Sequence, residues 1–476
     1  MGEIMKKTKI ICTIGPSSNT KEVMRNMIKE GMNVVRINLS HASKEEVKDI
    51  VSKIRELNNE LGSNVGILFD TKGPEIRVGK IKGNQAKLVE GSEIKISMRP
   101  VEGTKDEISV SYQGLVDDID IKDRVLIDDG LIEMVVVRKN KDSFICRVIN
   151  GGILSSNKGV NVPGIKLHNC FLSEKDKEDV ELACELNADF IALSYTSCAE
   201  DVLEVSDMLI AKDNNHMQII AKIENPCGVE ELEDIIRVSD GIMVARGDLG
   251  VEIPLEKLPG IQKDIIEKCH KTNKISIVAT QMLLTMQDNP RPSRAEVSDV
   301  YNAVLDGTDA VMLSGETTIG EYPVEAVSVM AKIAESAEEE INYMEFFERA
   351  MKGEKQDITC AVASGVVDSA YRLKAKVIVA ATKSGYTARK ISHMRPICPV
   401  IATTPSVDTA RSLSLNWGIY PVIVNIFYNT DDVIYNAEYE ARKYYDLEAG
   451  DKIIITGGLP LGESKHTNFM KVVEIK

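Results

Sequence analysis

The stretch Ile219-Ile-Ala-Lys222-Ile-Glu224-Asn225 is a short apolar run that ends in charged and polar residues. The same pattern recurs in Ile242-Met-Val-Ala-Arg246-Gly247-Asp248 and in Ile275-Ser-Ile-Val-Ala-Thr280-Gln281. Each run has the length of a buried strand and precedes a helix-like segment. Because the carboxyl ends of parallel barrel strands meet on one face, we expect these polar side chains to lie together. A lysine, two carboxylates and a threonine at one mouth suit metal-assisted phosphoryl or enolate chemistry.

Five further runs of this kind bring the number of β-then-α units to eight, which predicts a (β/α)8 TIM barrel of roughly 250 residues. Helix starts agree with this reading, because Ser173 to Asp176 resembles a capping box and Pro323 suits the first turn of the last barrel helix. The expected barrel strands are Lys9–Gly15, Asn33–Ser40, Val65–Thr71, Phe190–Tyr195, Gln218–Glu224, Gly241–Gly247, Ile275–Gln281 and Ala310–Ser314.

The pattern changes twice outside these units. Between about Pro74 and Leu167, short alternating runs rich in Val and Ile are separated by glycines, which predicts a small β-barrel lid inserted after the third barrel strand. Asp128-Asp129-Gly130 is a predicted hairpin turn within it. From about Gln356 a second α/β series predicts an open, mainly parallel sheet. The expected domains are therefore the barrel at residues 1–73 and 169–341, the lid at 74–168 and a regulatory domain at 342–476.

Composition narrows the class of protein. The chain has 476 residues, enough for two to four domains, and is 43% hydrophobic. A net charge of −15 with no basic tract argues against nucleic acid as a partner, and no apolar run reaches the ~20 residues of a membrane span. The nine scattered cysteines form no Cys-x-x-Cys pair, the six histidines are isolated, and no signal peptide is evident. These features predict a cytoplasmic protein without a disulfide framework or a zinc site.

Two carboxylates and a lysine form the proposed centre. Lys222 and Glu224 are two apart on one strand and so project from the same face. Asp248 follows the next strand after Gly247, where the missing Cβ lets a ligand approach the backbone. Carboxylates from neighbouring strand ends are typical of a Mg²⁺ site. Taken singly, each motif has an ordinary structural explanation. Lys222 and Glu224 could be an incidental ion pair on a solvated strand, and Arg246-Gly247-Asp248 could be a simple turn. Thr280 could be an ordinary strand residue.

Two further strand ends and one distal turn are also rich in polar groups. Asn38, Ser40, Asp70 and Thr71 offer oxygen atoms that could surround a monovalent cation, and Arg36 and Arg77 could bind phosphate or carboxylate. The polar groups at a single strand end could simply cap nearby backbone groups. Five polar strand ends on the same rim of the barrel are hard to explain by structure alone. The turn Thr382–Thr387 could seat a phosphate on its backbone N–H groups or could equally be a helix cap without a ligand.

Ten ordered stretches along essentially the whole chain resemble the pyruvate kinase family. This resemblance implies the same three-domain organisation and transfer of phosphate from phosphoenolpyruvate to ADP, in the last step of glycolysis. It also implies a homotetramer. The matching stretches are Thr13–Ser17, Val35–His41, Asp70–Arg77, Asp128–Gly130, Lys158–Gly164, Ala221–Asn225, Met243–Pro254, Ala279–Met282, Arg294–Asp299 and Met312–Thr317.

The resemblance also assigns roles residue by residue. It implies that Glu224 and Asp248 bind Mg²⁺ or Mn²⁺ and that Lys222 offsets the charge of the phosphoryl group in flight. Thr280 would order the water that protonates the enolate, and Glu75 is the residue of K⁺-dependent members. Phosphoenolpyruvate would contact Arg36, Lys222, Gly247, Asp248 and Thr280, and the nucleotide would contact Asn38, Leu39, Ser40, His41, Arg77 and Lys158. K⁺ would bind to Asn38, Ser40, Asp70 and Thr71. A phosphorylated effector would bind to Thr382, Lys383, Ser384, Gly385 and Thr387.

Departures from the family pattern leave other readings open. None removes a proposed ligand, but a common arginine after the fourth barrel strand is missing. A barrel lyase or mutase that forms a Mg²⁺-enolate would need no nucleotide, and a non-enzymatic relative would only sense phosphorylated metabolites. The departing positions are Ser197, Pro226, Cys227, Leu284 and Tyr301.

Overall fold

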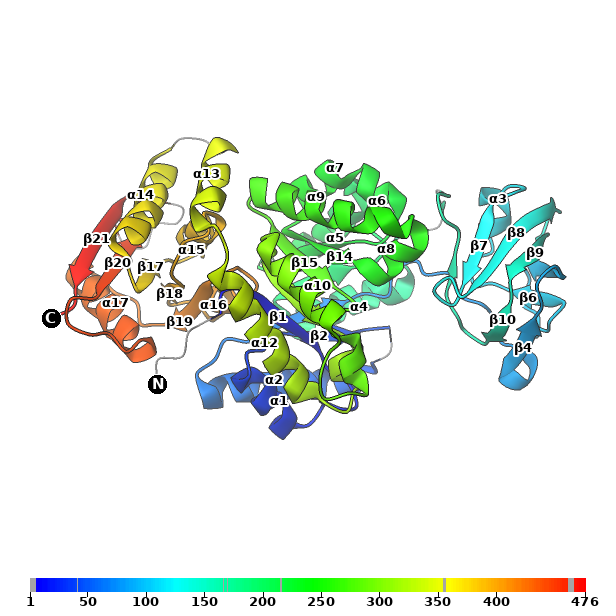
Figure 1. Cartoon of the computed structure of the whole chain (residues 1–476), viewed down its shortest axis with the longest axis horizontal. Helices are drawn as coiled ribbons and strands as arrows, with labels where there is room; N and C mark the ends of the chain where they lie inside the picture. Colours follow the sequence, from blue (N-terminus) through cyan, green and yellow to red (C-terminus); the bar gives the residue numbers. More distant parts are fainter. Residues whose placement is uncertain are drawn as a thin grey trace.

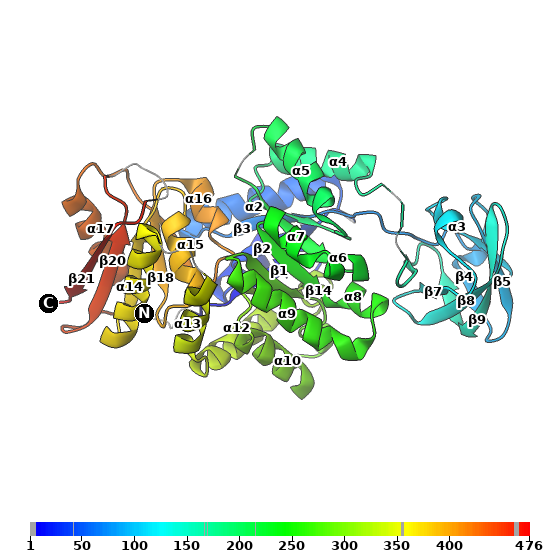
Figure 2. The same ribbon diagram turned by 90° about the horizontal axis from the view of Figure 1, so that it is seen from above.

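The computed structural model describes residues 6–40, 42–165, 167–168, 170–214, 216–353, 357–460 and 466–476. Three domains lie in a row, with the barrel in the middle, the inserted domain at one end and the C-terminal domain at the other (Figure 1). The same order is visible after a 90° turn (Figure 2). The predicted fold class is confirmed, and the inserted domain and the C-terminal domain adjoin opposite ends of the barrel.

Eight parallel strands close the central barrel in the order β1-β16-β15-β14-β13-β12-β3-β2. Glu224, Asp248 and Thr280 lie just beyond their strands, in the following loop or the first turn of the next helix, whereas Arg36, Asp70 and Lys222 lie within β2, β3 and β13. Apolar side chains such as Leu68, Ile220 and Met243 fill the inside. The strands are β1 (Lys9–Thr13), β2 (Val34–Asn38), β3 (Gly66–Asp70), β12 (Phe190–Leu193), β13 (Gln218–Ile223), β14 (Gly241–Ala245), β15 (Ile275–Ala279) and β16 (Ala310–Leu313).

Helices surround this barrel and bury their apolar stripes against its outer face. In α2 the buried positions Val47, Ile50 and Ile54 follow the helical period. The predicted capping box of Ser173 is confirmed, as is the start of α12 at Pro323. The barrel helices are α1 (Lys21–Lys29), α2 (Lys44–Leu61), α4 (Glu174–Glu185), α5 (Ala199–Ala211), α6 (Pro226–Glu230), α7 (Leu232–Val238), α8 (Arg246–Glu252), α9 (Leu258–Lys271), α10 (Arg294–Leu305), α11 (Gly315–Thr318) and α12 (Pro323–Glu339), with 3-10 turns η2 (Leu255–Lys257) and η3 (Leu284–Gln287).

The inserted domain, called the lid below, is a curled six-stranded sheet ordered β11-β7-β8-β9-β5-β6, with a second pair β10-β4. The predicted turn at Asp128-Asp129-Gly130 joins β7 to β8, and all three residues have positive φ. The sequence of Lys87–Met98 predicts one alternating run, but the chain turns at Gly91 (φ 79°) and the run is divided between two strands. The elements are η1 (Lys82–Asn84), β4 (Gln85–Leu88), β5 (Glu93–Ser97), β6 (Glu107–Ser109), α3 (Leu115–Asp118), β7 (Arg124–Ile127), β8 (Ile132–Lys139), β9 (Ser143–Asn150), β10 (Gly152–Ser155) and β11 (Val160–Asn161).

The C-terminal domain has a five-stranded sheet ordered β19-β18-β17-β20-β21. Helices α14 and α15 cover one face and α17 covers the other, so strand residues alternate between two apolar layers, as Ile378 and Val379 do. Strand β21 is antiparallel to β20 and was not expected from the sequence. The elements are α13 (Tyr343–Gly353), α14 (Ile358–Leu373), β17 (Val377–Ala381), α15 (Tyr386–His393), β18 (Val400–Thr404), α16 (Val407–Ser412), β19 (Ile419–Ile423), α17 (Thr430–Tyr444), β20 (Lys452–Gly457) and β21 (Phe469–Glu474).

The C-terminal domain docks on the amino-terminal ends of the barrel strands. Lys9, at the start of β1, donates to the carbonyl of Ile419 and lies over the ring of Tyr420. Arg395 donates to Asp309, just before β16, at 2.9 Å. The strand ends that carry the expected site residues are therefore at the opposite end of the barrel. In the described part of the chain, no helix has the length and apolarity needed to cross a membrane.

Candidate active site

The ammonium group of Lys222 is at the centre of the candidate site. Its Nζ is 2.9 Å from Glu224 Oε1 and 3.2 Å from Asp70 Oδ1, and it donates to Ser194 Oγ at 2.6 Å. The side chain is buried. Burial alone would lower the pKa of Lys222, but the Asp70 and Glu224 carboxylates outweigh it and raise this pKa above its ordinary value. Lys222 is therefore a fixed cation at the carboxyl end of β13.

Asp70, at the end of β3, joins two cations from other strands, Arg36 on β2 and Lys222 on β13. Its Oδ2 accepts from Arg36 Nε at 2.6 Å, and its Oδ1 faces Lys222. Arg36 also donates to Thr13 Oγ1 at 2.9 Å. Burial of Asp70 works to raise its pKa, but the charges of Arg36 and Lys222 prevail and hold it below the ordinary value. The structure thus brings the predicted residues Arg36, Asp70 and Lys222 into one buried ionic network.

Two carboxylates remain beside this network. Glu224 is 1% exposed, and its Oε2 accepts from the backbone N–H of Tyr195 at 2.6 Å. Burial raises the pKa of Glu224 and also that of Asp248, against the opposing charge of Lys222. No described residue donates a hydrogen bond to the Asp248 carboxylate or pairs with it. Asp248 is half-buried, and a partly desolvated carboxylate without a partner favours a bound cation.

The donor set fits a hard divalent cation. Mg²⁺ is typically held by one or two carboxylates, with waters and substrate oxygens completing its shell. Glu224 and Asp248, which follow neighbouring strands β13 and β14, supply that number. Within the described ranges, no group of three His, Cys, Asp or Glu side chains could enclose a metal without further ligands. Two carboxylates alone would leave most coordination positions of such an ion to other ligands.

Thr280 and Gly247 meet across the ends of β14 and β15. The Thr280 hydroxyl donates to the carbonyl of Ala279 at 2.6 Å and accepts from the N–H of Gly247 at 2.8 Å. Thr280 and Gln281 both adopt left-handed backbone conformations, with φ of 66° and 52°. Consecutive non-glycine residues in this region are costly and are concentrated at functional sites. One acceptor lone pair of the hydroxyl remains available to a water molecule.

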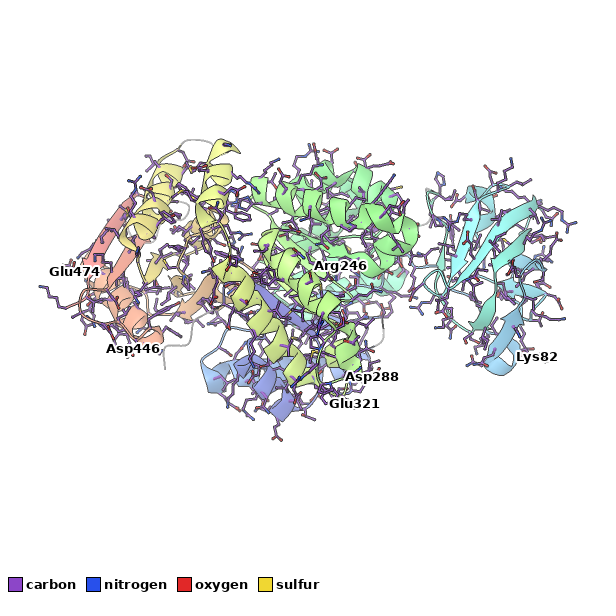
Figure 3. The ribbon with its side chains drawn as sticks, viewed as in Figure 1. Lys82, Arg246, Asp288, Glu321, Asp446 and Glu474 are labelled. Atoms are coloured by element: carbon purple, nitrogen blue, oxygen red, sulfur yellow. The ribbon has the colours of Figure 1, made fainter. Side chains whose placement is uncertain are left out.

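Arg246 fixes this strained loop and was not predicted to have a role. Its Nη1 is 2.8 and 2.7 Å from the two carboxylate oxygens of Asp299, and its Nη2 donates to the carbonyl of Thr280 at 2.6 Å. Figure 3 labels Arg246 within the barrel, whereas Lys82 marks the far end of the lid. The position of Arg246 directly after a strand, two residues before Asp248, was the only indication in the sequence.

Ser194 is a second residue that sequence reasoning missed. It directly follows the fourth barrel strand, β12, and donates to the carbonyl of Thr71 at 2.7 Å while it accepts from Lys222. Its hydroxyl also lies 3.2 Å from Asp70 Oδ1. The only indication of a functional role in the sequence was a serine at the end of a predicted strand, and serines are too common there to predict such a role. Its role depends on two other strands, β3 and β13, that only the closed barrel brings near.

The residues expected to bind K⁺ lie on the adjacent tips of β2 and β3. Asn38 Oδ1 accepts from the N–H of Ser40 at 3.0 Å, and Thr71 Oγ1 accepts from the N–H of Ser194 at 3.3 Å. Both oxygens of Asp70 already face cations or Ser194. The set supplies neutral oxygens and one carboxylate, which suits a weakly bound monovalent ion. Leu39 is buried between them, and its N–H donates to the carbonyl of Asp70 at 3.0 Å.

Two of the expected nucleotide contacts, Arg77 and Lys158, lie where the chain enters and leaves the lid, whereas Asn38, Leu39 and Ser40 lie at the end of β2. Arg77 pairs with Glu75 at 2.8 Å and donates to the carbonyl of Asn157 at 2.9 Å. Lys158 pairs with Asp128 at 2.7 Å. His41, also expected here, lies outside the described residues. Both described cations are thus held by lid carboxylates or carbonyls, and they would have to exchange these partners to bind a nucleotide.

The lid touches the barrel beside the candidate site. Asn161 donates to Glu252, at the end of α8, at 2.8 Å. Asp129 is close enough to Asp248 to contribute to its raised pKa, after the larger effect of burial. The turn at residues 128–130 therefore lies near the proposed metal ligand, and a movement of the lid would change the charge around Asp248.

The predicted effector turn lines a cavity of about 320 Å³ in the C-terminal domain. Gly385 (φ 78°) begins α15, and Thr387 Oγ1 is 2.7 Å from Thr467 Oγ1. The sequence also predicts that the segment from Gly457 to Thr467 closes over this turn, and residues 461–465 of that segment lie outside the described residues. The residues Thr382, Lys383, Ser384 and Thr387 all line this cavity, as do Gly458 and His466.

The residues that depart from the family pattern lie at positions where they do not disturb the ionic network around Lys222. Ser197 donates to the carbonyl of Tyr195 at 3.1 Å and accepts from Asn225 at 3.1 Å. Pro226 is the first residue of α6, where its missing N–H has no cost. Leu284 is exposed, and Tyr301 packs between α10 and the barrel core. Cys227 follows Pro226 in the first turn of α6.

Comparison with known proteins covers nearly the whole chain. The family model described as pyruvate kinase, barrel domain, matches residues 5–327, and that described as pyruvate kinase, alpha/beta domain, matches residues 360–473. Proteins named pyruvate kinase from Staphylococcus saprophyticus and Staphylococcus haemolyticus are each 47% identical over 98% of this chain. One from Sporosarcina psychrophila is 46% identical over the same share. The matches cover 80% of each relative's length.

Proposed function

This chain belongs to the pyruvate kinase family and transfers the phosphoryl group of phosphoenolpyruvate to ADP, and we propose that Lys222, Glu224 and Asp248 form its catalytic centre. The observation that carries this proposal is the asymmetry around Lys222. One side of the ammonium is held by Asp70, Glu224 and Ser194, while the nearby Asp248 carboxylate has no partner among the described residues. A site of this kind is arranged to receive a cation and a phosphorylated anion together.

Phosphoryl transfer requires positioning and neutralisation of charge more than covalent chemistry from the protein. Glu224 and Asp248 would hold Mg²⁺ or Mn²⁺, which when bound supplies Lewis-acid stabilisation of the phosphoryl and enolate oxygens. Lys222 has three N–H bonds, all directed to protein oxygens. The longest of these contacts, to Asp70 at 3.2 Å, is the one that we expect to be exchanged for a phosphoryl oxygen.

Arg36 and the loop after β15 would position phosphoenolpyruvate. Arg36 is anchored by Asp70 and Thr13, which leaves part of its guanidinium for the substrate phosphate. The bare backbone of Gly247 allows close approach on the other side. Once the phosphoryl group has left, the enolate must gain a proton at carbon, and Thr280 is suited to hold the water that delivers it. A hydroxyl alone is a poor acid at neutral pH, so the water is part of the proposal.

ADP would be bound between the barrel mouth and the lid. Asn38, Leu39, Ser40 and His41 form the barrel side of the proposed site, and Arg77 and Lys158 form the lid side. Because Lys158 is paired with Asp128 in the lid, it takes part only when the lid closes over the mouth. Closure would also exclude water, which strengthens every charge interaction in the site.

Several finer properties are inferences from family membership. We propose that K⁺ binds at Asn38, Ser40, Asp70 and Thr71, and the presence of Glu75 supports K⁺ dependence. The cavity at Thr382–Thr387 is proposed to bind a phosphorylated effector. A cytoplasmic homotetramer is also proposed.

The test is pyruvate formation from phosphoenolpyruvate, with and without ADP, in Mg²⁺ buffers that contain either K⁺ or Na⁺. We expect activity that requires ADP, because a lyase or mutase would not need a nucleotide, and we expect it to fall sharply in Na⁺. Activity that is independent of ADP would contradict phosphoryl transfer. Equal activity in K⁺ and Na⁺ would contradict only the K⁺ site, and no activity from folded protein with effectors present would favour a regulatory relative.

A further inference from the structure

A second, larger cavity lies at the other end of the barrel from the candidate active site. It has a volume of about 900 Å³ and separates the starts of β13 and β15 from helices α15 and α16. Lys271 and Lys274 line its barrel side, and Arg389 and Ser412 line its C-terminal side. Its volume is within the range of about 300–1,000 Å³ that is usual for small-molecule sites. It is separate from the cavity at Thr382–Thr387, although Ser384 and Tyr386 line both.

Four buried polar side-chain atoms in the wall of this cavity have no hydrogen-bond partner among the described residues. They are His216 Nε2, Gln218 Oε1, Arg389 Nε and Asn416 Oδ1. The Asn416 side chain is more than nine-tenths buried, with 8% relative exposure for the residue. Buried polar atoms are nearly always paired in folded proteins, and leaving one unpaired is destabilising. The residues that line this cavity therefore carry hydrogen-bonding capacity that no described residue satisfies.

Arg389 gives this ligand a charge. Its Nη1 donates to the carbonyl of Ser384 at 3.0 Å, and its Nη2 donates to Ser412 Oγ at 3.4 Å. In the described ranges no carboxylate lies within ion-pair distance of it. Burial lowers the pKa of Arg389, and the nearest opposing charge is Asp240. A largely buried guanidinium whose partners are a carbonyl and a hydroxyl is suited to an anion.

The other charges in the cavity wall leave a positive excess. Lys274 donates to the carbonyl of Ser239 and has no carboxylate partner within the described part of the chain. Asp240 already accepts from the N–H of Ile219 at 2.9 Å, and Asp408 pairs with Arg411 at 2.7 Å. The charge of Asp408, which also lines the cavity, is thus offset by an arginine. In a chain with a net charge of −15, this local excess favours an anionic ligand.

We propose that this cavity binds a small phosphorylated metabolite, with Arg389 and Lys274 at the phosphate and with Asn416 and Gln218 at its polar groups. Such a ligand would link the barrel to the C-terminal domain directly. It would also act on the turn at residues 382–387, because the carbonyl of Ser384 is held by Arg389. The site is therefore a second point of control, distinct from the proposed effector turn and from the substrate site.

The experiment measures binding of inorganic phosphate, sulfate and glycerol 3-phosphate to the full chain by calorimetry. Three variants accompany the parent. Arg389→Gln removes the guanidinium, and Ser412→Asp places a carboxylate beside it that competes with the ligand. Thr387→Val alters the other cavity and serves as the matched control. We expect glycerol 3-phosphate to bind to this cavity at least tenfold more weakly in Arg389→Gln than in the parent. In Ser412→Asp, binding to this cavity should not be measurable. In Thr387→Val, binding to this cavity should be the same as in the parent.

The Ser412→Asp variant also separates a loss of binding from a loss of folding. Because its new carboxylate would pair with Arg389, we expect its melting temperature without ligand to be above that of the parent. Glycerol 3-phosphate binding that is unchanged in both cavity variants, or lost only in Thr387→Val, would overturn the proposal. Equally weak binding of phosphate, sulfate and glycerol 3-phosphate would show an adventitious ion only, and would also overturn it.

Discussion

Lys222 is the residue on which the ionic network of the active site depends. It touches two carboxylates that are almost fully buried, Asp70 and Glu224, within 3.2 Å. Removing one partner from a buried charge pair usually costs about 3–5 kcal/mol, because the remaining charge stays buried without compensation. The residue therefore serves both the reaction and the stability of the strand ends, and a test of one must measure the other.

We predict that Lys222→Met lowers kcat by at least about 10²–10³-fold, the usual effect of removing one preorganised charge from a transition state. The melting temperature should fall as well, because Asp70 and Glu224 lose their cation. Mg²⁺ binding should remain largely intact, since both proposed ligands are still present. Steady-state kinetics, thermal melts and Mg²⁺ titration check the three statements.

Lys175→Met is the matched control for that variant. Lys175 pairs with Asp179 at 2.7 Å on α4, away from the strand tips, and its side chain is half exposed. We expect this control to keep the kcat of the parent. An unchanged kcat in Lys222→Met would contradict the role assigned to Lys222.

At the scale of elements, the site consists of loops that hold one another. Helix α8 begins with Arg246, and this one side chain binds the loop after β15 and the helix α10 through Asp299. The planar guanidinium forms these contacts in several directions at once, which a lysine cannot do. The left-handed conformations of Thr280 and Gln281 are maintained by contacts of this kind.

We predict that Arg246→Lys lowers kcat by about 10–100-fold while the protein stays folded, because small displacements of positioning groups have effects of this size. The loss should come from Thr280, whose backbone carbonyl Arg246 holds. Steady-state kinetics and a thermal melt measure it. Arg237→Lys, on the exposed side of α7, is the control that should have no effect. A variant at Arg246 with the activity of the parent would show that the loop keeps its shape without the guanidinium.

The sequence predicts elements better than it predicts contacts. All eight barrel strands were expected because apolar runs of strand length are a local pattern, and the turn at Asp128 was expected because its chemistry is local too. Strand β21 was missed, since Phe469–Glu474 has mostly exposed or half-buried side chains and lies at a sheet edge. The contacts of Ser194 and Arg246 were missed because their partners Lys222, Asp70 and Asp299 are 28 to 124 residues away in the chain, or lie on loops that only barrel closure brings together.

At the scale of the whole molecule, two histidines are buried where the barrel meets the C-terminal domain. His270 of α9 and His393 of α15 have ring centroids 5.0 Å apart. Burial, and for His270 the charge of Arg395, lowers the pKa of each to about 3. Arg349 and Lys390 act in the same direction, and Asp309 opposes them at His393. Both rings are therefore neutral in the folded protein at ordinary pH.

We predict that this interface weakens as the pH falls below about 6.5, the pKa of an unfolded histidine. The folded pKa is lower than the unfolded one, so the unfolded chain binds more protons and stability declines from pH 6.5 downward toward 3. Between pH 7 and 5.5 the protonation of the two histidines in the unfolded chain should lower the free energy of unfolding by an amount on the order of 2 kcal/mol. Melting temperatures at the two pH values measure the loss.

The variant His270→Gln/His393→Gln should lose less stability than the parent over this range. His168→Gln is the control, because His168 is in the lid, where its side chain is 77% exposed beside Asp118. That control should keep the full pH response of the parent. A double variant with the same response would show that other groups cause the acid sensitivity.

The closure of the barrel by its first and last strands has a consequence for how the chain is made. β1 pairs with β2 soon after both are synthesised, but its other edge pairs with Ala310–Leu313, about 300 residues later. At about 5–20 residues per second, a ribosome needs roughly 15–60 s to reach that point. During this time the nascent chain carries an open strand edge, which is a template for pairing with other chains. Its need for chaperones should therefore be greatest before β16 emerges, well before the C-terminal domain has been translated.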